Sequence, residues 1–138
     1  MDQSPRQPAL FPLTLAPAAL RGMRGACPRC GEARLFARWL RPTGRCSQCG
    51  QDWTLHVADD FPPYISIFLT GHLMAPLLIW LVLEQHLSAW AAAAIIIPFS
   101  VIVMLGVLQP AKGAVIALQW WLGMGAFVRE RAQDKPAA

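Results

Sequence analysis

The chain contains four cysteines, which form two Cys-x-x-Cys-Gly pairs, Cys27 with Cys30 and Cys46 with Cys49. Two cysteines separated by two residues let a tight turn place both sulfurs on one ion, and a second pair completes a tetrahedron. The glycine after each pair supplies the backbone freedom that the chain needs to turn away from the ion. The pattern therefore predicts one closed site of four thiolate ligands, with structural zinc as the metal.

Other uses of the cysteines fit the sequence less well. Disulfides need an oxidising compartment, and a redox pair of the thioredoxin type is expected near a strand–helix–strand pattern, which the sequence lacks. A lipoprotein cysteine at Cys27 would need an apolar residue where Arg24 stands. Rubredoxin-like iron remains an alternative to zinc, because four thiolates also suit iron.

Residues 23–60 are expected to form a zinc-ribbon-like domain that depends on its metal, since domains below about 40 residues usually need such a staple. Arg29 and Arg45 lie inside or beside the cysteine pairs, where they are expected to offset the negative charge of the thiolates. Six large apolar residues are expected to form the small core of the ribbon: Leu35, Phe36, Trp39, Leu40, Trp53 and Leu55.

The N-terminal segment 1–22 is expected to be a disordered, Pro-rich tail. Its apolar stretch 9–20 is interrupted by Pro12 and Pro17 and has only Arg6 as a basic start, which makes it a poor signal peptide.

Residues 61–128 are expected to be a membrane domain. Segment 64–83 contains twenty residues without a formal charge, and a helix of that length is about 30 Å long, which matches the hydrocarbon core of a bilayer. Segment 89–108 is a second run of the same length, and the short connection 84–88 forces an antiparallel hairpin. Trp80 and Trp90 flank the connection, as expected of residues at a membrane interface.

The placement of positive charge predicts the orientation of this hairpin. Eight arginines precede the first span, the connection has no Lys or Arg, and the chain after the second span contains Lys112, Arg129, Arg131 and Lys135. The positive-inside rule then puts both termini in the cytoplasm, with the hairpin in a bacterial inner membrane. Because orientation explains the formal net charge of +4, no nucleic-acid partner is needed.

Segment 111–128 is apolar enough for a third span, but Lys112, Gln119 and Gly123 recur at helical spacing on one face. A third span would also carry the basic tail 129–138 outward. We therefore expect an interfacial amphipathic helix, with Trp120 and Trp121 at the level of the lipid headgroups.

His72 is the ionisable residue deep in the first span, and such residues are candidates for function. The simplest expectation is a neutral imidazole hydrogen-bonded across the helix pair, where Ser100 lies at a similar depth. His56 is expected to support a zinc ligand, and Asp59 with Asp60 to cap the first span. The sequence contains no catalytic motif, so an enzyme is not expected.

Several segments together resemble the small bacterial membrane-protein family known as domain of unknown function 983. They are Cys-Pro-Arg-Cys-Gly at 27–31, Leu35-Phe36, 46–50, Asp59-Asp60, Gly71-His72-Leu73, Lys112-Gly113-Ala114 and Leu118-Gln119-Trp120. Phe61 departs from the family pattern, which has a glycine there. The resemblance implies a bacterial inner-membrane protein with a cytoplasmic cysteine domain, and it suggests a link to respiratory oxidase biogenesis.

The expected fold is thus a membrane protein with a four-cysteine zinc ribbon, a transmembrane α-helical hairpin and a C-terminal amphipathic or third membrane helix. We expect a non-enzymatic adaptor or assembly factor that contacts the lipid bilayer and a larger membrane protein complex. The alternative is a metal or electron relay that uses the four cysteines and His72.

Overall fold

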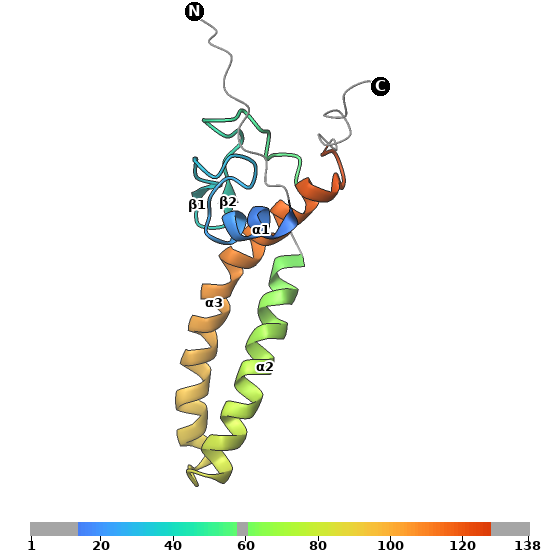
Figure 1. Cartoon of the computed structure of the whole chain (residues 1–138). Helices are drawn as coiled ribbons and strands as arrows, with labels where there is room; N and C mark the ends of the chain where they lie inside the picture. The colour runs from blue at the N-terminus through green and yellow to red at the C-terminus, as the bar shows by residue number, and fades with distance from the viewer. Residues whose placement is uncertain (1–13, 58–60, 128–138) are drawn as a thin grey trace, which may run out of the picture.

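The computed structural model describes residues 14–57 and 61–127. Its elements are α1 (Leu15–Met23), β1 (Phe36–Arg38), β2 (Arg41–Pro42), α2 (Phe61–Leu83) and α3 (Ala89–Leu122). The helices α2 and α3 form a long hairpin, and all the other elements gather at the end of the hairpin where α2 begins (Figure 1). We call residues 24–57, which contain the four cysteines and the two strands, the cysteine module.

The two hairpin helices contain the expected apolar spans, but α3 is longer than expected. The helix α2 has 23 residues and α3 has 34, and an eighteen-residue stretch of each has a mean hydropathy of 2.0 and 2.6, respectively. Both helices are therefore long and apolar enough to cross a membrane. Ser88 is the N-cap residue of α3, and its hydroxyl oxygen accepts a hydrogen bond from the backbone N–H of Ala91 at 3.4 Å.

The contact between the two helices depends on small and polar side chains. Ser66 of α2 is fully buried, and its hydroxyl donates a hydrogen bond to the carbonyl oxygen of Met104 in α3 at 2.7 Å. Thr70, one turn further along α2, is also buried. Met74 and Leu81 of α2 are buried as well, but most large apolar side chains of the two helices are exposed. Only 22% of the apolar stretch of α2 and 6% of that of α3 are buried.

The segment expected to be a separate interfacial helix is the continuation of α3. This helix passes through Pro110 and ends at Gly123, whose φ of 66° lies in the left-handed region that stops helices. Figure 1 shows α3 bending where it leaves the hairpin, as expected at a proline that cannot donate the helical hydrogen bond. The expected boundary between the second span and segment 111–128 is therefore absent, since α3 continues without interruption to Leu122.

The last part of α3 is covered by protein. Its buried residues are Ala111, Gly113, Val115, Ile116, Ala117 and Trp120. Trp120 is 6% exposed and packs edge-on against Trp53, with ring centroids 6.1 Å apart, so its ring belongs to the protein core and is not open to lipid. Trp121 is half-buried against the same cluster.

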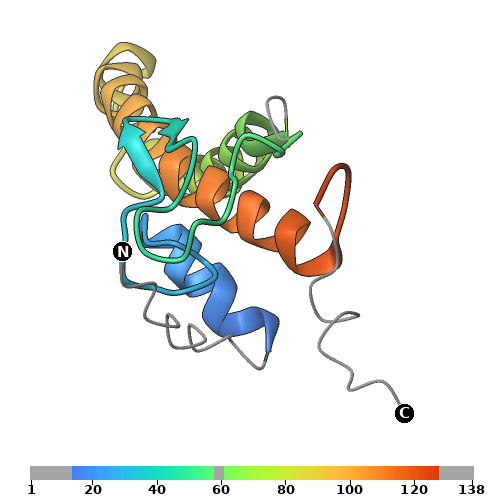
Figure 2. The same ribbon diagram turned by 90° about the horizontal axis from the view of Figure 1, so that it is seen from above.

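Residues 15–22, expected to belong to a disordered tail, form most of α1. Pro17 is tolerated because it stands in the first turn, where the backbone N–H has no partner within the helix. Seen from above, α1 runs alongside the last part of α3 (Figure 2). The helices touch backbone to backbone, because a methyl group on either Gly22 or Gly113 would overlap the carbonyl group of the other. Residues 1–13 of the expected tail lie outside the described residues.

The core of the cysteine module agrees with the sequence in part. Leu35, Phe36 and Trp53 are buried as expected, and Leu55 packs partly against them. Trp39 was expected in the core, but it is 56% exposed because it stands at the turn between β1 and β2. Leu40 follows it at a left-handed φ of 64° and is half-buried.

The glycine contact between α1 and α3 gives a first prediction. Gly113→Ala should destabilise the protein by roughly 1–3 kcal/mol, because the new methyl group must push α1 away from α3. Gly106→Ala in the same helix is the matched control, since nothing lies within 4 Å of the methyl group it would add. Thermal unfolding in mild detergent and hydrogen exchange of the α1 amides measure the difference. Equal behaviour of the two variants would contradict the close contact.

Candidate metal centre

Each cysteine pair lies in a small loop of the same construction. In the first, the backbone N–H of Gly31 donates to the carbonyl of Cys27 at 2.8 Å, and Gly31 has a φ of 76°. In the second, the N–H of Gly50 donates to the carbonyl of Cys46 at 3.0 Å, and Gly50 has a φ of 73°. Both glycines therefore adopt a left-handed conformation, which uses the backbone freedom expected of them at the turn.

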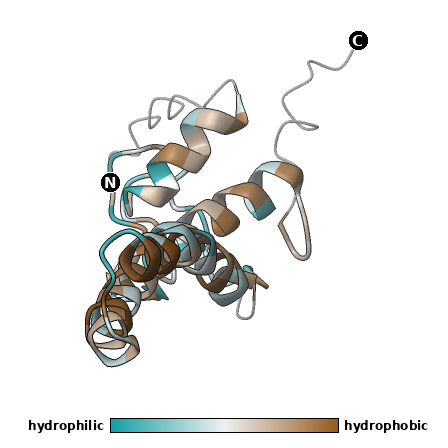
Figure 3. Ribbon diagram, turned by 90° about the horizontal axis from the view of Figure 1, so that it is seen from below, coloured by the Kyte–Doolittle hydropathy of each residue, from teal (hydrophilic) through white to brown (hydrophobic). Residues whose placement is uncertain are grey.

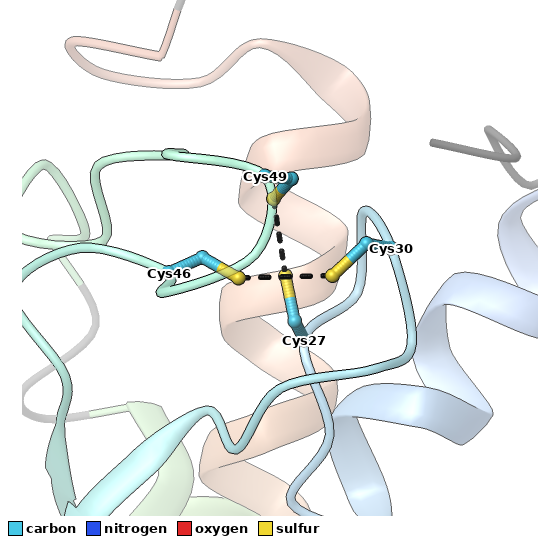
Figure 4. A group of neighbouring side chains, drawn as sticks. All are labelled: Cys27, Cys30, Cys46 and Cys49. Atoms are coloured by element: carbon cyan, nitrogen blue, oxygen red, sulfur yellow. Dashed lines mark hydrogen bonds between the residues drawn. The ribbon is translucent and has the colours of Figure 1, made fainter. Parts of the chain in front are cut away.

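The four sulfurs converge on one point (Figure 4). The Sγ atoms of Cys27 and Cys49 are 3.8 Å apart, those of Cys30 and Cys46 are 3.6 Å apart, and all four lie within 4.8 Å of one another. A tetrahedron with metal–sulfur bonds of about 2.3 Å has edges of about 3.8 Å, so these separations suit an ion at its centre. The cysteines are not joined by disulfides. The predicted clustering is confirmed, and both zinc and iron accept this set of donors.

The site lies between the cysteine module and α3. Cys27 and Cys46 are buried in one cluster with Ile116 and Trp120 of α3, while Cys30 and Cys49 are half-buried on its outer side. An ion held by all four sulfurs would therefore connect the two loops of the module to each other where they pack against α3.

Two arginines connect the loops around the sulfurs. Arg29 donates a hydrogen bond from Nη1 to the carbonyl oxygen of Cys49 at 3.0 Å, so it joins the first loop to the second. Arg21 of α1 donates from Nη1 to the carbonyl oxygen of Arg29 at 3.3 Å. Arg45, expected to act like Arg29, instead lies 3.9 Å from the Asp52 carboxylate, and its side chain is largely exposed.

Sequence reasoning missed Arg21 because the residue belongs to the segment that was expected to be a disordered tail. The helical register that brings it to the first loop depends on the contact between α1 and α3. A regular spacing of Ala18 with Gly22 and of Gly113 with Ala117 is the signal that could have revealed this contact.

The thiols differ in their acidity. Burial raises the pKa of the Cys27 thiol far above its ordinary value, and burial also raises the pKa of Cys49. Burial acts in the same sense on Cys30, but hydrogen bonds from the backbone N–H groups of Ala33 and Glu32 outweigh it and lower the pKa of Cys30 to about 7. At neutral pH the Cys27 and Cys49 thiols therefore keep their protons until a metal displaces them.

Another contact joins the end of the cysteine module to α3. The side-chain amide of Gln119 accepts a hydrogen bond from the backbone N–H of Val57 at 3.1 Å and donates one to its carbonyl oxygen at 3.3 Å. From the sequence, Gln119 was expected on the polar face of an interfacial helix. It instead pairs with the backbone of Val57, close to the beginning of α2.

His56 contacts the backbone of the cysteine module. His56 hydrogen-bonds through Nδ1 to the carbonyl oxygen of Trp53 at 2.6 Å, so this ring nitrogen supports the module backbone. Asp59 and Asp60 lie outside the described residues.

His72 is separated from the metal centre and does not bridge the two helices. It stands eleven residues into α2, about 16 Å along the helix axis from Phe61. Its Nδ1 hydrogen-bonds to the carbonyl oxygen of Phe68 in the same helix at 2.9 Å, and its ring lies 4.1 Å from that of Phe68. Ser100 likewise donates to Ile97 in its own helix. The expected interhelical bond is made by Ser66 instead, and His72 is exposed on the outside of the hairpin.

Comparison with known proteins adds a family and nothing further. The family model described as "Protein of unknown function (DUF983)" matches residues 36–120, which is more than half of the chain. The matched segment starts at β1, contains Cys46 and Cys49, and ends at Trp120, so the first cysteine pair precedes it. No curated protein and no solved structure matches the chain.

The acidity of the thiols gives a second prediction. Metal affinity should rise steeply with pH between about 6 and 8, because binding must release the protons of at least Cys27 and Cys49. Competition titrations against a chelator of known affinity measure this dependence, with Ser47→Ala as a control in the second loop. An affinity that does not change over this pH range would show that the thiols are already ionised.

Proposed function

We propose that this chain, which belongs to the DUF983 family of proteins of unknown function, is a non-enzymatic adaptor of the bacterial inner membrane. In this proposal the hairpin is embedded in the bilayer, and the cysteine module holds one structural zinc ion and docks a partner on the cytoplasmic side. The observation that carries the proposal is the continuity of α3, which runs from the apolar hairpin into the buried wall of the cysteine module. A single helix thus fixes the docking module to the anchor.

The surface of the hairpin supports its place in a membrane. Large apolar side chains on α2 and α3 point away from the protein, and brown residues recur along both helices in Figure 3. A soluble protein rarely exposes apolar patches larger than a few hundred Å². A bilayer covers such a surface without any further protein partner. The exposed Trp80 and Trp90 near the helix connection suit the opposite membrane interface.

The proposed orientation follows from the charges and the cysteines. The arginines from Arg21 to Arg45 and Lys112 lie on the side of the cysteine module, and the connection 84–88 has no basic residue. Four free thiols also suit the reducing cytoplasm. Both termini are then cytoplasmic.

The site itself favours a structural role for zinc. A catalytic zinc usually has three protein ligands and an open position for water or substrate, whereas four cysteines complete the shell of a structural ion. In the part of the chain that the structure describes, the four cysteines are the only group of His, Cys, Asp or Glu side chains arranged to hold a metal. The proposed function is therefore docking, and the proposed partner is a larger membrane protein complex. Assembly of respiratory oxidases is the process to which we would look first.

A metal or electron relay is the second candidate. The partial exposure of Cys30 and Cys49 favours it, because metal or electrons can reach these two sulfurs from outside. A relay would also have to use His72, which lies far along α2. The identity of the bound metal separates the two proposals, since redox-active iron suits a relay and zinc suits docking.

The third prediction concerns this metal. Elemental analysis of the protein purified from membranes should find about one zinc per chain, because the four thiolates form a single closed site. A variant with both Cys46→Ser and Cys49→Ser should lose the zinc and the fold of the cysteine module but remain in the membrane fraction. Ser47→Ala, at an exposed position between these cysteines, should keep both. Full zinc occupancy in the double-serine variant would refute the site, and iron in the wild-type protein would favour the relay.

The fourth prediction concerns orientation. A single introduced cysteine at Gln85 should react with an impermeant thiol reagent applied from outside the cytoplasm, because this connection lies at the far end of the hairpin. Cysteines introduced at the exposed positions Thr14 and Met124 should react only after the membrane is opened, since both lie at the module end. A variant with no introduced cysteine controls for the native thiols. Labelling of Met124→Cys and Gln85→Cys from the same side would contradict the proposed hairpin.

A further inference from the structure

One turn of the cysteine module presents apolar and basic side chains together. Trp39 and Leu40 form the turn between β1 and β2, and Trp39 is 56% exposed. Arg38 and Arg41 flank these two residues, and both are exposed. We call the four residues Arg38 to Arg41 the hairpin tip. The metal centre does not use the tip, and an exposed tryptophan of this size is costly to leave in water.

The base of the same β-hairpin lies at the level where α3 leaves the long helical hairpin. The nearest neighbours of a side chain placed on Gly25 would be the ring of Phe36, in β1, and the amide nitrogen of Gln109, in α3. Gln109 directly follows the apolar run 89–108. Figure 1 agrees, since β1 and β2 are drawn at the same height as α1, immediately above the long hairpin. If the long hairpin spans a bilayer, the hairpin tip is therefore carried near the plane of the lipid headgroups.

The helix α1 lies at the same level and offers a similar surface. Leu20 and Met23 are exposed on neighbouring turns of α1, at 52% and 46%, and Arg24 follows at the helix end. In the view from below, which looks along the long hairpin toward the cysteine module, α1 is not hidden by α2 or α3 (Figure 3). The side of α1 that faces a membrane is thus open to it.

We propose that the hairpin tip and the exposed side of α1 rest on the anionic leaflet of the membrane that holds the long hairpin. In this arrangement Trp39 and Leu40 enter the headgroup region, and Arg38 and Arg41 bind lipid phosphates. Tryptophan prefers this region because its ring is apolar and its N–H is polar, and arginine binds phosphate through several donors. The inference rests on the proposed membrane location, and it adds an orientation of the cysteine module and a lipid preference.

The negative charge of the lipid headgroups favours a membrane surface as the partner of the hairpin tip. Each arginine held at an anionic surface contributes about 1 kcal/mol, which raises the affinity for that surface slightly more than fivefold. Arg38 and Arg41 together therefore raise the affinity about 30-fold. An acidic protein or a nucleic acid would also bind the arginines, but it would need an apolar or stacking site beside its negative charges to accept Trp39 and Leu40. A membrane surface satisfies both kinds of side chain at once, and the continuity with the long hairpin keeps that surface within reach.

The test measures tryptophan fluorescence of the full-length protein in lipid nanodiscs that carry a nitroxide quencher on the headgroup. Subtracting the emission of Trp39→Phe from that of the wild type isolates Trp39. We expect strong quenching of this difference in discs that contain phosphatidylglycerol, and less in discs of phosphatidylcholine alone. A variant with both Arg38→Gln and Arg41→Gln should lose the dependence on phosphatidylglycerol. Arg45→Gln is the matched control, since Arg45 is also exposed but lies beside Asp52 in the second loop.

Trp90 separates failure of this inference from failure of the proposed function. Trp90 is 86% exposed at the far end of the long hairpin, so the difference between the wild type and Trp90→Phe reports insertion of that hairpin. Quenching of Trp90 without quenching of Trp39 would overturn the proposed contact and leave the membrane anchor intact. Absence of quenching for both would overturn the anchor itself. Equal quenching of Trp39 in charged and neutral discs would refute the role of the arginines.

Discussion

The packing of the cysteine module against the last part of α3 is the contact on which the rest of the structure depends. The module has two very short strands and cannot enclose a core of its own. Trp53 is completely buried because Trp120 and Phe127 lie beside it, with ring centroids 6.1 and 6.0 Å away. Gln119 fixes the backbone of Val57 to the same helix. The module thus uses a helix that begins in the apolar hairpin as one wall of its core.

This shared helix explains which features were visible in the sequence. The four-cysteine site was predictable because the spacing of each pair and the glycine after it determine a local turn. The two apolar spans were predictable because an uncharged run of about twenty apolar residues is visible in the composition alone. The environment of segment 111–122 was not predictable in the same way, since its apolar residues could equally face lipid or protein. Only the contact with Trp53 shows that Trp120 belongs to the protein interior.

The other differences also come from contacts between distant segments. Pro17 made residues 15–22 look like part of a tail, and the compensating contact of Gly22 with Gly113 joins residues that are far apart in sequence. Trp39 and Trp53 have the same side chain, yet one stands at a turn and the other beneath α3. Between the long helices, Ser66 makes the interhelical bond that was assigned to His72. Helix rotation determines which of these polar residues faces the partner helix, and composition does not fix that rotation.

The arrangement also separates the two sources of stability in this chain. The long hairpin is held by its own packing and by the bond from Ser66 to Met104, and neither involves the cysteines. A structural zinc can contribute about 10–16 kcal/mol of apparent binding energy, and in the proposed adaptor that energy would act on the two cysteine loops and their packing against α3. Loss of the metal would then unfold the cysteine module and leave the long hairpin intact. If the module docks a partner as proposed, metal supply would control docking without changing how the hairpin is held.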